Sequence, residues 1–285
     1  MAAAYRAAEC GRPDELFHDP LAARLAGERG RRIVARLPEK AFIGGWSVVI
    51  RTRVIDEQIG AAIAEGADRV LNLGAGLDTR PYRMELPDAL RWIEIDQPHV
   101  IAFKERSLAG EIPRCRLERI GLDLSDARAR STVLEQATAG AGNVLVLTEA
   151  VIPYLAGDAV ASLAADLRAI PVIRQWIVDY FSPEAYAYRR RSGMTRAMEN
   201  APFRFEPKDY FGFFTGLGWR PKDVRYLAIE ADRWNRPPAF PASVRWTTRL
   251  MRLFLSAERR AAMKKHTGYV LFEPDEGGSP LSRTI

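Results

Sequence analysis

The chain has 285 residues, 47% of them hydrophobic, with a formal net charge of +6 at pH 7, a length that suits one domain with additions. Two cysteines and three histidines provide neither a disulfide framework nor a structural zinc set. The N-terminus has no apolar signal stretch, and later apolar stretches stop short of the roughly 20 residues that span a bilayer. We therefore expect a single domain over 1–285 that is cytoplasmic, contacts no membrane and holds no metal.

The basic excess is concentrated in three places. Arginines gather in residues 29–36 and in the triplet 189–191, and arginines and lysines gather in residues 259–265. Such clusters raise the possibility of a nucleic-acid partner. No RRM or KH signature accompanies them, so we interpret the charge mainly as solvated surface. Nucleic acid is therefore not an expected partner, while an anionic small molecule stays open.

Taken in chain order, the predicted elements begin with helices at about residues 20–36 and 47–64. The predicted strands are 69–74, 91–95, 115–121, 143–148, 174–181, 223–230 and 268–273. The helices between them are 98–109, 126–138, 157–168 and 207–217, and another helix follows the proline-rich turn 235–241 and runs to about 265. This alternation predicts an α/β fold with a doubly wound, mostly parallel sheet.

Two regions exceed the core of such a sheet, which residues 66–181 carry. One is the helical N-terminal extension 1–65, and the other is 182–285, which holds helical insertions and the final strands. Loops at the ligand-facing end of a sheet vary while the scaffold holds its position. We therefore expect these regions to form a lid over the ligand.

The most informative segment is a short apolar strand that ends in the turn Gly74-Ala-Gly76. Glycines let a ligand approach the backbone, and Asp96, twenty residues on at the end of the next strand, suits the two hydroxyls of a ribose. Thr79 stands where a dinucleotide fingerprint has its third glycine, which disfavours a pyrophosphate. S-adenosylmethionine, a nucleoside without pyrophosphate, fits this pattern better than NAD.

Several motifs in fixed order resemble the leucine carboxyl methyltransferase family of S-adenosylmethionine-dependent O-methyltransferases, in its bacterial branch. They run from His18 to Tyr154 and comprise Phe17-His-Asp-Pro-Leu-Ala22, Ile50-Arg-Thr-Arg-Val-Ile-Asp56, Asn72-Leu-Gly-Ala-Gly-Leu-Asp-Thr-Arg80, Glu94-Ile-Asp96, Gly121-Leu-Asp-Leu124 and Thr148-Glu-Ala-Val-Ile-Pro-Tyr154. The resemblance implies the class I methyltransferase fold, a Rossmann-like sheet of seven strands with the last one antiparallel. It also implies an enzyme with S-adenosyl-L-methionine as cofactor.

The resemblance assigns the cofactor contacts to particular positions. Arg53 would hold the methionine carboxylate, and Gly74, in the turn with Gly76, would leave room for the methionine portion and offer its carbonyl to the amino group. Asp96 would take the ribose hydroxyls. The remaining contacts are Asp123 and Leu124 at the adenine edge, and Glu149 near the ammonium and sulfonium groups.

Each assignment has a plainer alternative. Arg53 lies on a predicted helix, where it also fits a solvated surface position. Asp123 and Asp126 also suit the cap of the helix that starts near Ser125. The two glycines also suit a tight turn without a ligand.

On the acceptor side we name Arg80, Tyr154 and Tyr186 as candidates, and we assign no catalytic residue. Arg80 and Arg83, together with Arg51, would either neutralise an acceptor carboxylate or form structural ion pairs with Asp78 and Glu85. Aromatic residues are dense after residue 180, and for Phe211 and Phe214 we favour the buried face of a helix. His266, Tyr154 and Asp179 are considered as bases and none is chosen.

The predicted function is methyl transfer to a carboxylate or hydroxyl of a small-molecule acceptor, a specialised metabolite. An ionised carboxylate needs no general base, whereas a hydroxyl would benefit from one. The alternatives are methylation of a protein's C-terminal carboxylate, methylation of nucleic acid, and a cofactor-binding protein without turnover. The acceptor and the oligomeric state stay undefined.

Overall fold

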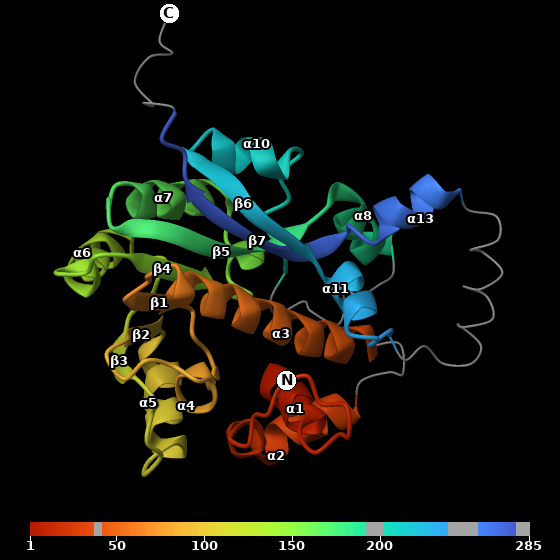
Figure 1. The fold of residues 1–285 in the computed structure, drawn as a ribbon, viewed down its shortest axis with the longest axis horizontal. Coiled ribbons are helices and arrows are strands. Elements are labelled where there is room, and N and C mark those ends of the chain that lie inside the picture. Colours follow the sequence, from red (N-terminus) through yellow and green to blue (C-terminus); the bar gives the residue numbers. More distant parts are fainter. Residues whose placement is uncertain (37–41, 192–201, 239–255, 278–285) are drawn as a thin grey trace, which may run out of the picture.

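The computed structural model describes residues 1–36, 42–191, 202–238 and 256–277. Within them, seven strands form one sheet in the order β3-β2-β1-β4-β5-β7-β6 (Figure 1). The strands are β1 (Arg69–Leu73), β2 (Arg91–Asp96), β3 (Arg116–Gly121), β4 (Val144–Thr148), β5 (Ile173–Phe181), β6 (Trp219–Tyr226) and β7 (Thr267–Pro274). This confirms the predicted doubly wound α/β sheet.

Only β7 runs against its neighbours. It pairs antiparallel with β5 and with β6, whereas the pairs among β1 to β5 are parallel. Leu73 is level with Ile95, and Asp96 is level with Gly121. The carboxyl ends of β1, β2 and β3 therefore meet at one edge of the sheet, where open α/β sheets bind ligands.

The sheet is covered on both faces. The N-terminal helices are α1 (Ala2–Glu9), α2 (Ala22–Ala35), α3 (Phe42–Ala64), α4 (Arg80–Arg83) and α5 (Pro98–Ser107). The others are α6 (Ala127–Thr138), α7 (Gly157–Arg168), α8 (Pro183–Arg191), α10 (Tyr210–Thr215), α11 (Leu227–Arg233), α13 (Ala257–Met263) and the short 3₁₀ turn η2 (Ile152–Tyr154). One apolar cluster joins the sheet to α6, α7 and α10, and another joins it to α3 and α11 (Figure 1).

Burial on both faces explains the continuous apolar runs in the central strands. All five residues of β1 and all five of β4 are buried, and such runs are typical of parallel strands covered on both sides. Phe214 of α10 is fully buried and Phe211 is partly buried, as expected for the helix face. Asp209 caps that helix by accepting the N–H of Gly212.

The predicted strand 223–230 was wrong in extent, because β6 covers Trp219–Tyr226, and several helices were not predicted. The predicted strand 223–230 ends at Tyr226, and α11 begins at Leu227 because Leu227 and Ala231, one helical turn apart, pack on the core. Helices α1, α4, α8 and α11 were not predicted as separate elements. The predicted helix that runs to about residue 265 is described only as α13, and residues 239–255 lie outside the described residues.

The additional helices lie near the ligand-facing edge. Helix α8 follows β5, α11 follows β6, and α13 precedes the antiparallel β7, so the topology brings all three to the carboxyl ends of the parallel strands (Figure 1). Among the described helices, none is long and apolar enough to cross a membrane. The expected cytoplasmic location stays a prediction.

Candidate active site

The glycine turn after β1 requires backbone conformations that glycine adopts readily. Gly74 has φ 73° and Gly76 has φ 48°, in the left-handed region that other residues rarely occupy. A Cβ on Gly74 would lie 2.4 Å from Cγ2 of Val151. Val151 therefore occupies the space where a side chain on Gly74 would lie, whereas the sequence predicted that this space is open to a ligand.

Two hydrogen bonds to carboxylates hold the glycine turn in place. The amide of Asn72 donates to Asp78 at 2.8 Å. The N–H of Gly76 donates to the carboxylate of Asp96 at 2.6 Å. The predicted ribose ligand Asp96 is thus brought against the glycine turn, with a second oxygen accepting the N–H of Gln97 at 2.7 Å.

Asp123 and Leu124 follow β3 at the same edge of the sheet. Asp123 is exposed and accepts the N–H and the hydroxyl of Ser125 at 2.9 and 2.8 Å. Bonding from Ser125 and from Gln97 lowers the pKa of Asp123. The cap of α6 is Asp126, which accepts the N–H of Ala129. The capping alternative therefore holds for Asp126, while Asp123 forms a local turn beside Gln97.

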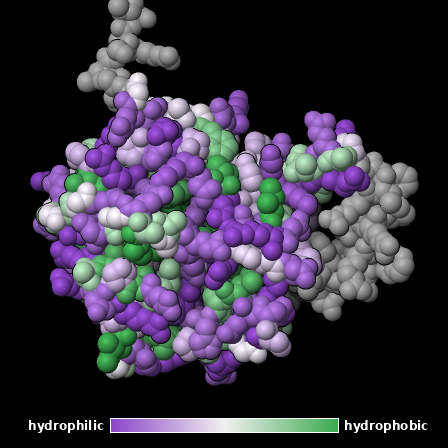
Figure 2. Space-filling view, in the orientation of Figure 1, coloured by the Kyte–Doolittle hydropathy of each residue, from purple (hydrophilic) through white to green (hydrophobic). Residues whose placement is uncertain are grey.

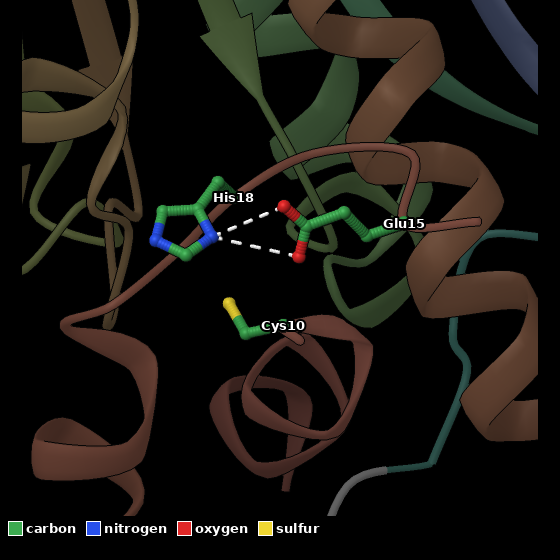
Figure 3. Close-up of side chains that lie close together, drawn as sticks. All are labelled: Cys10, Glu15 and His18. Carbon is green, nitrogen blue, oxygen red and sulfur yellow. Dashed lines mark hydrogen bonds and ion pairs between the residues drawn. The ribbon is translucent and has the colours of Figure 1, made fainter. Parts of the chain in front are cut away.

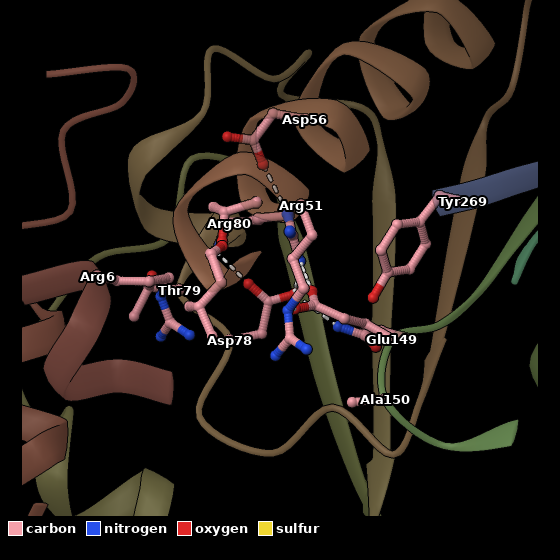
Figure 4. A network of polar contacts seen from close by, with 12 residues as sticks. Arg6, Arg51, Asp56, Asp78, Thr79, Arg80, Glu149, Ala150 and Tyr269 are labelled. Carbon is pink, nitrogen blue, oxygen red and sulfur yellow. Dashed lines mark hydrogen bonds and ion pairs between the residues drawn. The ribbon is translucent and has the colours of Figure 1, made fainter. Parts of the chain in front are cut away.

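Glu149 lies directly after β4 and meets two arginines (Figure 4). Its oxygens lie 2.9 Å from Nε of Arg51 and 2.9 Å from Nη1 of Arg80. Burial acts to raise the pKa of Glu149, but the guanidiniums of Arg80 and Arg51 outweigh it and the pKa lies below its usual value. Glu149 is therefore ionised at neutral pH.

Arg80 lies in a buried network rather than facing open space. Its Nε donates to Asp56 at 2.7 Å, and its Nη1 donates to Asp78 at 2.8 Å and to Glu149. Arg83 also binds Asp56, at 2.7 Å, so the structural partner is Asp56 and not the expected Glu85. With its side chain 2% exposed, Arg80 fits the structural alternative better than an acceptor contact.

The two arginines of the Ile50–Asp56 motif face different surroundings. Arg53 pairs with Glu57 at 3.2 Å and donates to the carbonyl of Leu16 at 3.3 Å. Arg51 lies against Glu149 instead. The N–H on its Nε is buried but not aligned for a hydrogen bond, and among the described contacts its terminal nitrogens have none. Arg51 thus has terminal donors beside Glu149 that make no hydrogen bond among the described contacts.

A third group beside Glu149 joins Ala150 to Asp179, which the sequence analysis considered only as a base. Ala150 has φ 57°, a conformation that costs free energy for a residue with a Cβ. Its N–H donates to both oxygens of Asp179 on β5, and Oδ1 of Asp179 also accepts the hydroxyl of Tyr269 at 2.7 Å. Burial raises the pKa of Asp179 to about 6, although Tyr269 and Arg51 act against it.

Aromatic rings pack around Tyr154 and Tyr186, the two tyrosines predicted to contact the acceptor. Tyr154 of η2 packs edge-to-face on Phe203 with 5.2 Å between ring centroids, and Phe203 also meets Phe181 and the buried Tyr186. The Arg189 guanidinium lies 3.7 Å from the Phe203 ring centroid. The predicted Tyr154 and Tyr186 are therefore joined through Phe203, which the sequence analysis placed only in the general aromatic region.

Comparison with known proteins agrees with this fold. Residues 1–168 match the model of the family "Leucine carboxyl methyltransferase". A "Putative S-adenosyl-L-methionine-dependent methyltransferase" of Frankia alni is 30% identical over 255 residues, covering 83% of this chain and 86% of that protein. Two crystal structures share the fold. A DUF574 family protein of Streptomyces avermitilis matches with a TM-score of 0.55 and 12% identity, covering 96% of this chain and 97% of that chain. A "putative methyltransferase" of Thermobifida fusca matches with a TM-score of 0.57 and 13% identity, covering 96% of this chain and 94% of that chain.

The fold and the site define a class I S-adenosylmethionine-dependent methyltransferase. The chain belongs to the leucine carboxyl methyltransferase family. The predicted family, fold, enzyme class and cofactor are thereby confirmed, whereas the roles of single residues and the acceptor stay predictions.

Proposed function

We propose that this enzyme transfers a methyl group to the carboxylate of a small molecule, a specialised metabolite, with a hydroxyl acceptor as the alternative. The observation that carries the proposal is the convergence of three features at one edge of the sheet. These are the Gly74–Gly76 turn, Asp96 bound to that turn, and the Arg51–Glu149 pair after β4. The acceptor would lie on the aromatic side, beyond Tyr154.

The residues at this edge suit the parts of the cofactor. The carbonyl of Gly74 and the ionised Glu149 are acceptors for its amino group, and the free capacity of Asp96 suits the ribose hydroxyls. Asp123 and Leu124, next to Gln97, would bind the adenine edge. Arg51 offers unpaired donors for the methionine carboxylate, which a planar guanidinium binds through two parallel hydrogen bonds. We therefore propose Arg51 in the role that the family resemblance gave to Arg53.

The cofactor, when bound, supplies an already activated methyl group, so the protein mainly has to align the acceptor and exclude water. Two carboxylates beside Arg51, the partly buried Glu149 and the buried Asp179, are already engaged. Glu149 is held ionised between Arg51 and Arg80, and both oxygens of Asp179 accept hydrogen bonds. Neither is free to remove a proton, which favours an acceptor that arrives ionised.

Some arginines of the clusters that suggested nucleic acid are engaged in ion pairs. Arg190 pairs with Glu206, and Arg32 lies 3.8 Å from Glu28. The visible face is mostly hydrophilic, with apolar residues scattered among polar ones (Figure 2). These pairs support a small acceptor over a nucleic acid, whose binding would fall steeply with salt.

Calorimetric titration with S-adenosylmethionine and S-adenosylhomocysteine, followed by assays of S-adenosylhomocysteine release, tests the proposal. Asp96→Ala should weaken cofactor binding about tenfold or more, because a hydrogen bond to a charged group is lost. Glu105→Ala, an exposed change on α5, is the matched control. Release should be faster with carboxylic acids than with the corresponding alcohols.

Each half of the proposal can be contradicted separately. Folded wild-type protein that binds neither cofactor form would overturn the assigned site. Cofactor binding without release of S-adenosylhomocysteine across acids, alcohols, peptide C-termini and RNA would favour a protein without turnover. Release that depends on peptide or RNA alone would overturn the small-molecule acceptor.

A further inference from the structure

The loop between α1 and α2 brings together three side chains of different chemistry. The Sγ of Cys10, a carboxylate oxygen of Glu15 and a ring nitrogen of His18 all lie within 4.8 Å of one another. Nδ1 of His18 is 3.2 Å from Oε1 of Glu15. Figure 3 shows the sulfur pointing toward this His18–Glu15 pair. Thiolate, imidazole and carboxylate are the three ligand types that zinc takes in proteins.

Two of these groups are already oriented by the backbone. The N–H of Asp19 donates to Sγ of Cys10 at 2.9 Å, and the N–H of Gly11 donates to Oε2 of Glu15 at 2.8 Å. Such outer contacts fix the direction of metal ligands and are part of an organised metal site. They leave Oε1 of Glu15 directed at His18.

The charges around the loop leave Glu15 without a permanent cation. Glu9 and Asp14 each meet Arg12 and Arg236, and Asp19 meets Arg6. Among the ion pairs of the described residues, Glu15 has only His18. Because no arginine or lysine pairs with Glu15 among the described residues, its carboxylate can bind a divalent ion.

We propose that Cys10, Glu15 and His18 bind a zinc ion, with water as the fourth ligand. Zinc lies about 2.0–2.3 Å from such ligands in a tetrahedron, which places the ligand atoms roughly 3.3–3.8 Å apart. The His18–Glu15 separation is already close to this range, and Sγ needs to move inward by about 1 Å or less. Binding releases the thiol proton to solvent. The sequence prediction of no metal counted cysteines and histidines but not the carboxylate between them.

The proposed ion lies in the loop between α1 and α2, which is hydrogen-bonded to residues beside the glycine turn. Asp19, whose N–H contacts Cys10, accepts Nε of Arg6 at 2.8 Å and the hydroxyl of Thr79 at 2.7 Å. Arg6 also donates to the carbonyl of Leu77 at 2.5 Å. Zinc would tie both ends of this loop together and so hold α1 against the glycine turn.

The test is titration of tag-free protein comprising residues 1–285 with Zn²⁺ by calorimetry and with Co²⁺ by absorbance. Wild type should bind equimolar zinc, and the cobalt form should show a thiolate-to-metal charge-transfer band. Cys10→Ser should abolish that band, and both Cys10→Ser and His18→Asn should weaken zinc binding by on the order of 100-fold or more. Cys115→Ser and His99→Asn are matched controls and should bind as wild type does.

The readouts use neither cofactor nor turnover, so the zinc proposal stands or falls independently of the proposed function. The His18 side chain is 64% exposed, so His18→Asn should fold normally, which circular dichroism checks. Absence of saturable zinc binding by wild type would overturn the proposal. Zinc binding that persists in either ligand variant, or that is lost in a control variant, would overturn it as well.

Discussion

Both carboxylate oxygens of Asp179 accept the backbone N–H of Ala150, at 3.1 and 2.9 Å. Asp179 lies near the carboxyl end of β5. Ala150 lies in the chain between Glu149 and Val151. Glu149 contacts Arg51, and Val151 lies where a side chain on Gly74 would be. The bond therefore holds a strained residue between two groups of the candidate site. Backbone strain at such places persists only when the surroundings fix it.

From this contact we predict a difference between two substitutions of Asp179. Asp179→Asn keeps an oxygen for Ala150 and should retain most of the activity. Asp179→Ala leaves the N–H of Ala150 unpaired and releases the strain, so turnover should fall about tenfold or more while the protein stays folded. Steady-state kinetics and thermal unfolding of both variants measure this. Equal activity of Asp179→Ala and wild type would show that the bond does not position Glu149.

The raised pKa of Asp179 gives a second prediction, for stability against pH. In the unfolded chain this carboxyl titrates near its ordinary value of 3.8, and in the folded protein near about 6. The folded state thus binds the proton more tightly, and this contribution, complete below about pH 4, is lost as the pH rises through 6. The loss is roughly 3 kcal/mol.

Asp179→Asn cannot ionise and serves as the reference. Its unfolding free energy relative to wild type should rise between about pH 4 and pH 6 and then level off, as measured by denaturant titration at each pH. Groups with lowered pKa values, such as Glu149, are present in both proteins and cancel in the difference. A difference independent of pH would mean that Asp179 does not titrate in this range.

Arg51 and Arg53 allow a matched comparison on one helix. Because Arg51 lies against Glu149 after β4 while Arg53 is bound to Glu57 and Leu16, Arg51→Met should weaken S-adenosylmethionine binding about tenfold or more. Arg53→Met should change it little. Calorimetry with the cofactor measures both affinities. The reverse order would restore Arg53 to the role that the family resemblance gave it.

The sequence predicted the strands best where burial leaves a clear pattern. The interior apolar runs of β1 and β4 were placed within about one residue. Strand β6 was misplaced because only Trp219 in it is buried, so its pairing depends on the backbone of β7 and leaves little pattern in side chains.

In the candidate site, the sequence predicted that the glycine turn lies beside the end of the next strand. Gly74, Gly76 and Asp96 form one motif, and the structure brings Gly76 and Asp96 into contact. Residues two apart on a helix point in nearly opposite directions, so which arginine of α3 faces Glu149 depends on how the helix packs. The bond between Ala150 and Asp179 spans 29 residues, and an alanine carries no sign of positive φ.

The two glycines of the turn give the last prediction. Gly74→Ala places a Cβ 2.4 Å from Val151, whereas the nearest atom to a Cβ on Gly76 is 3.9 Å away. Both changes carry the cost of a positive φ, about 1–2 kcal/mol, and Gly74→Ala adds overpacking of roughly 1–3 kcal/mol. In denaturant unfolding, Gly74→Ala should therefore destabilise the protein more than Gly76→Ala. Adding Val151→Ala should recover part of the loss for Gly74→Ala and none for Gly76→Ala, because only the first pair is in contact. Equal effects of Val151→Ala in the two backgrounds would mean that Val151 does not occupy the space above Gly74.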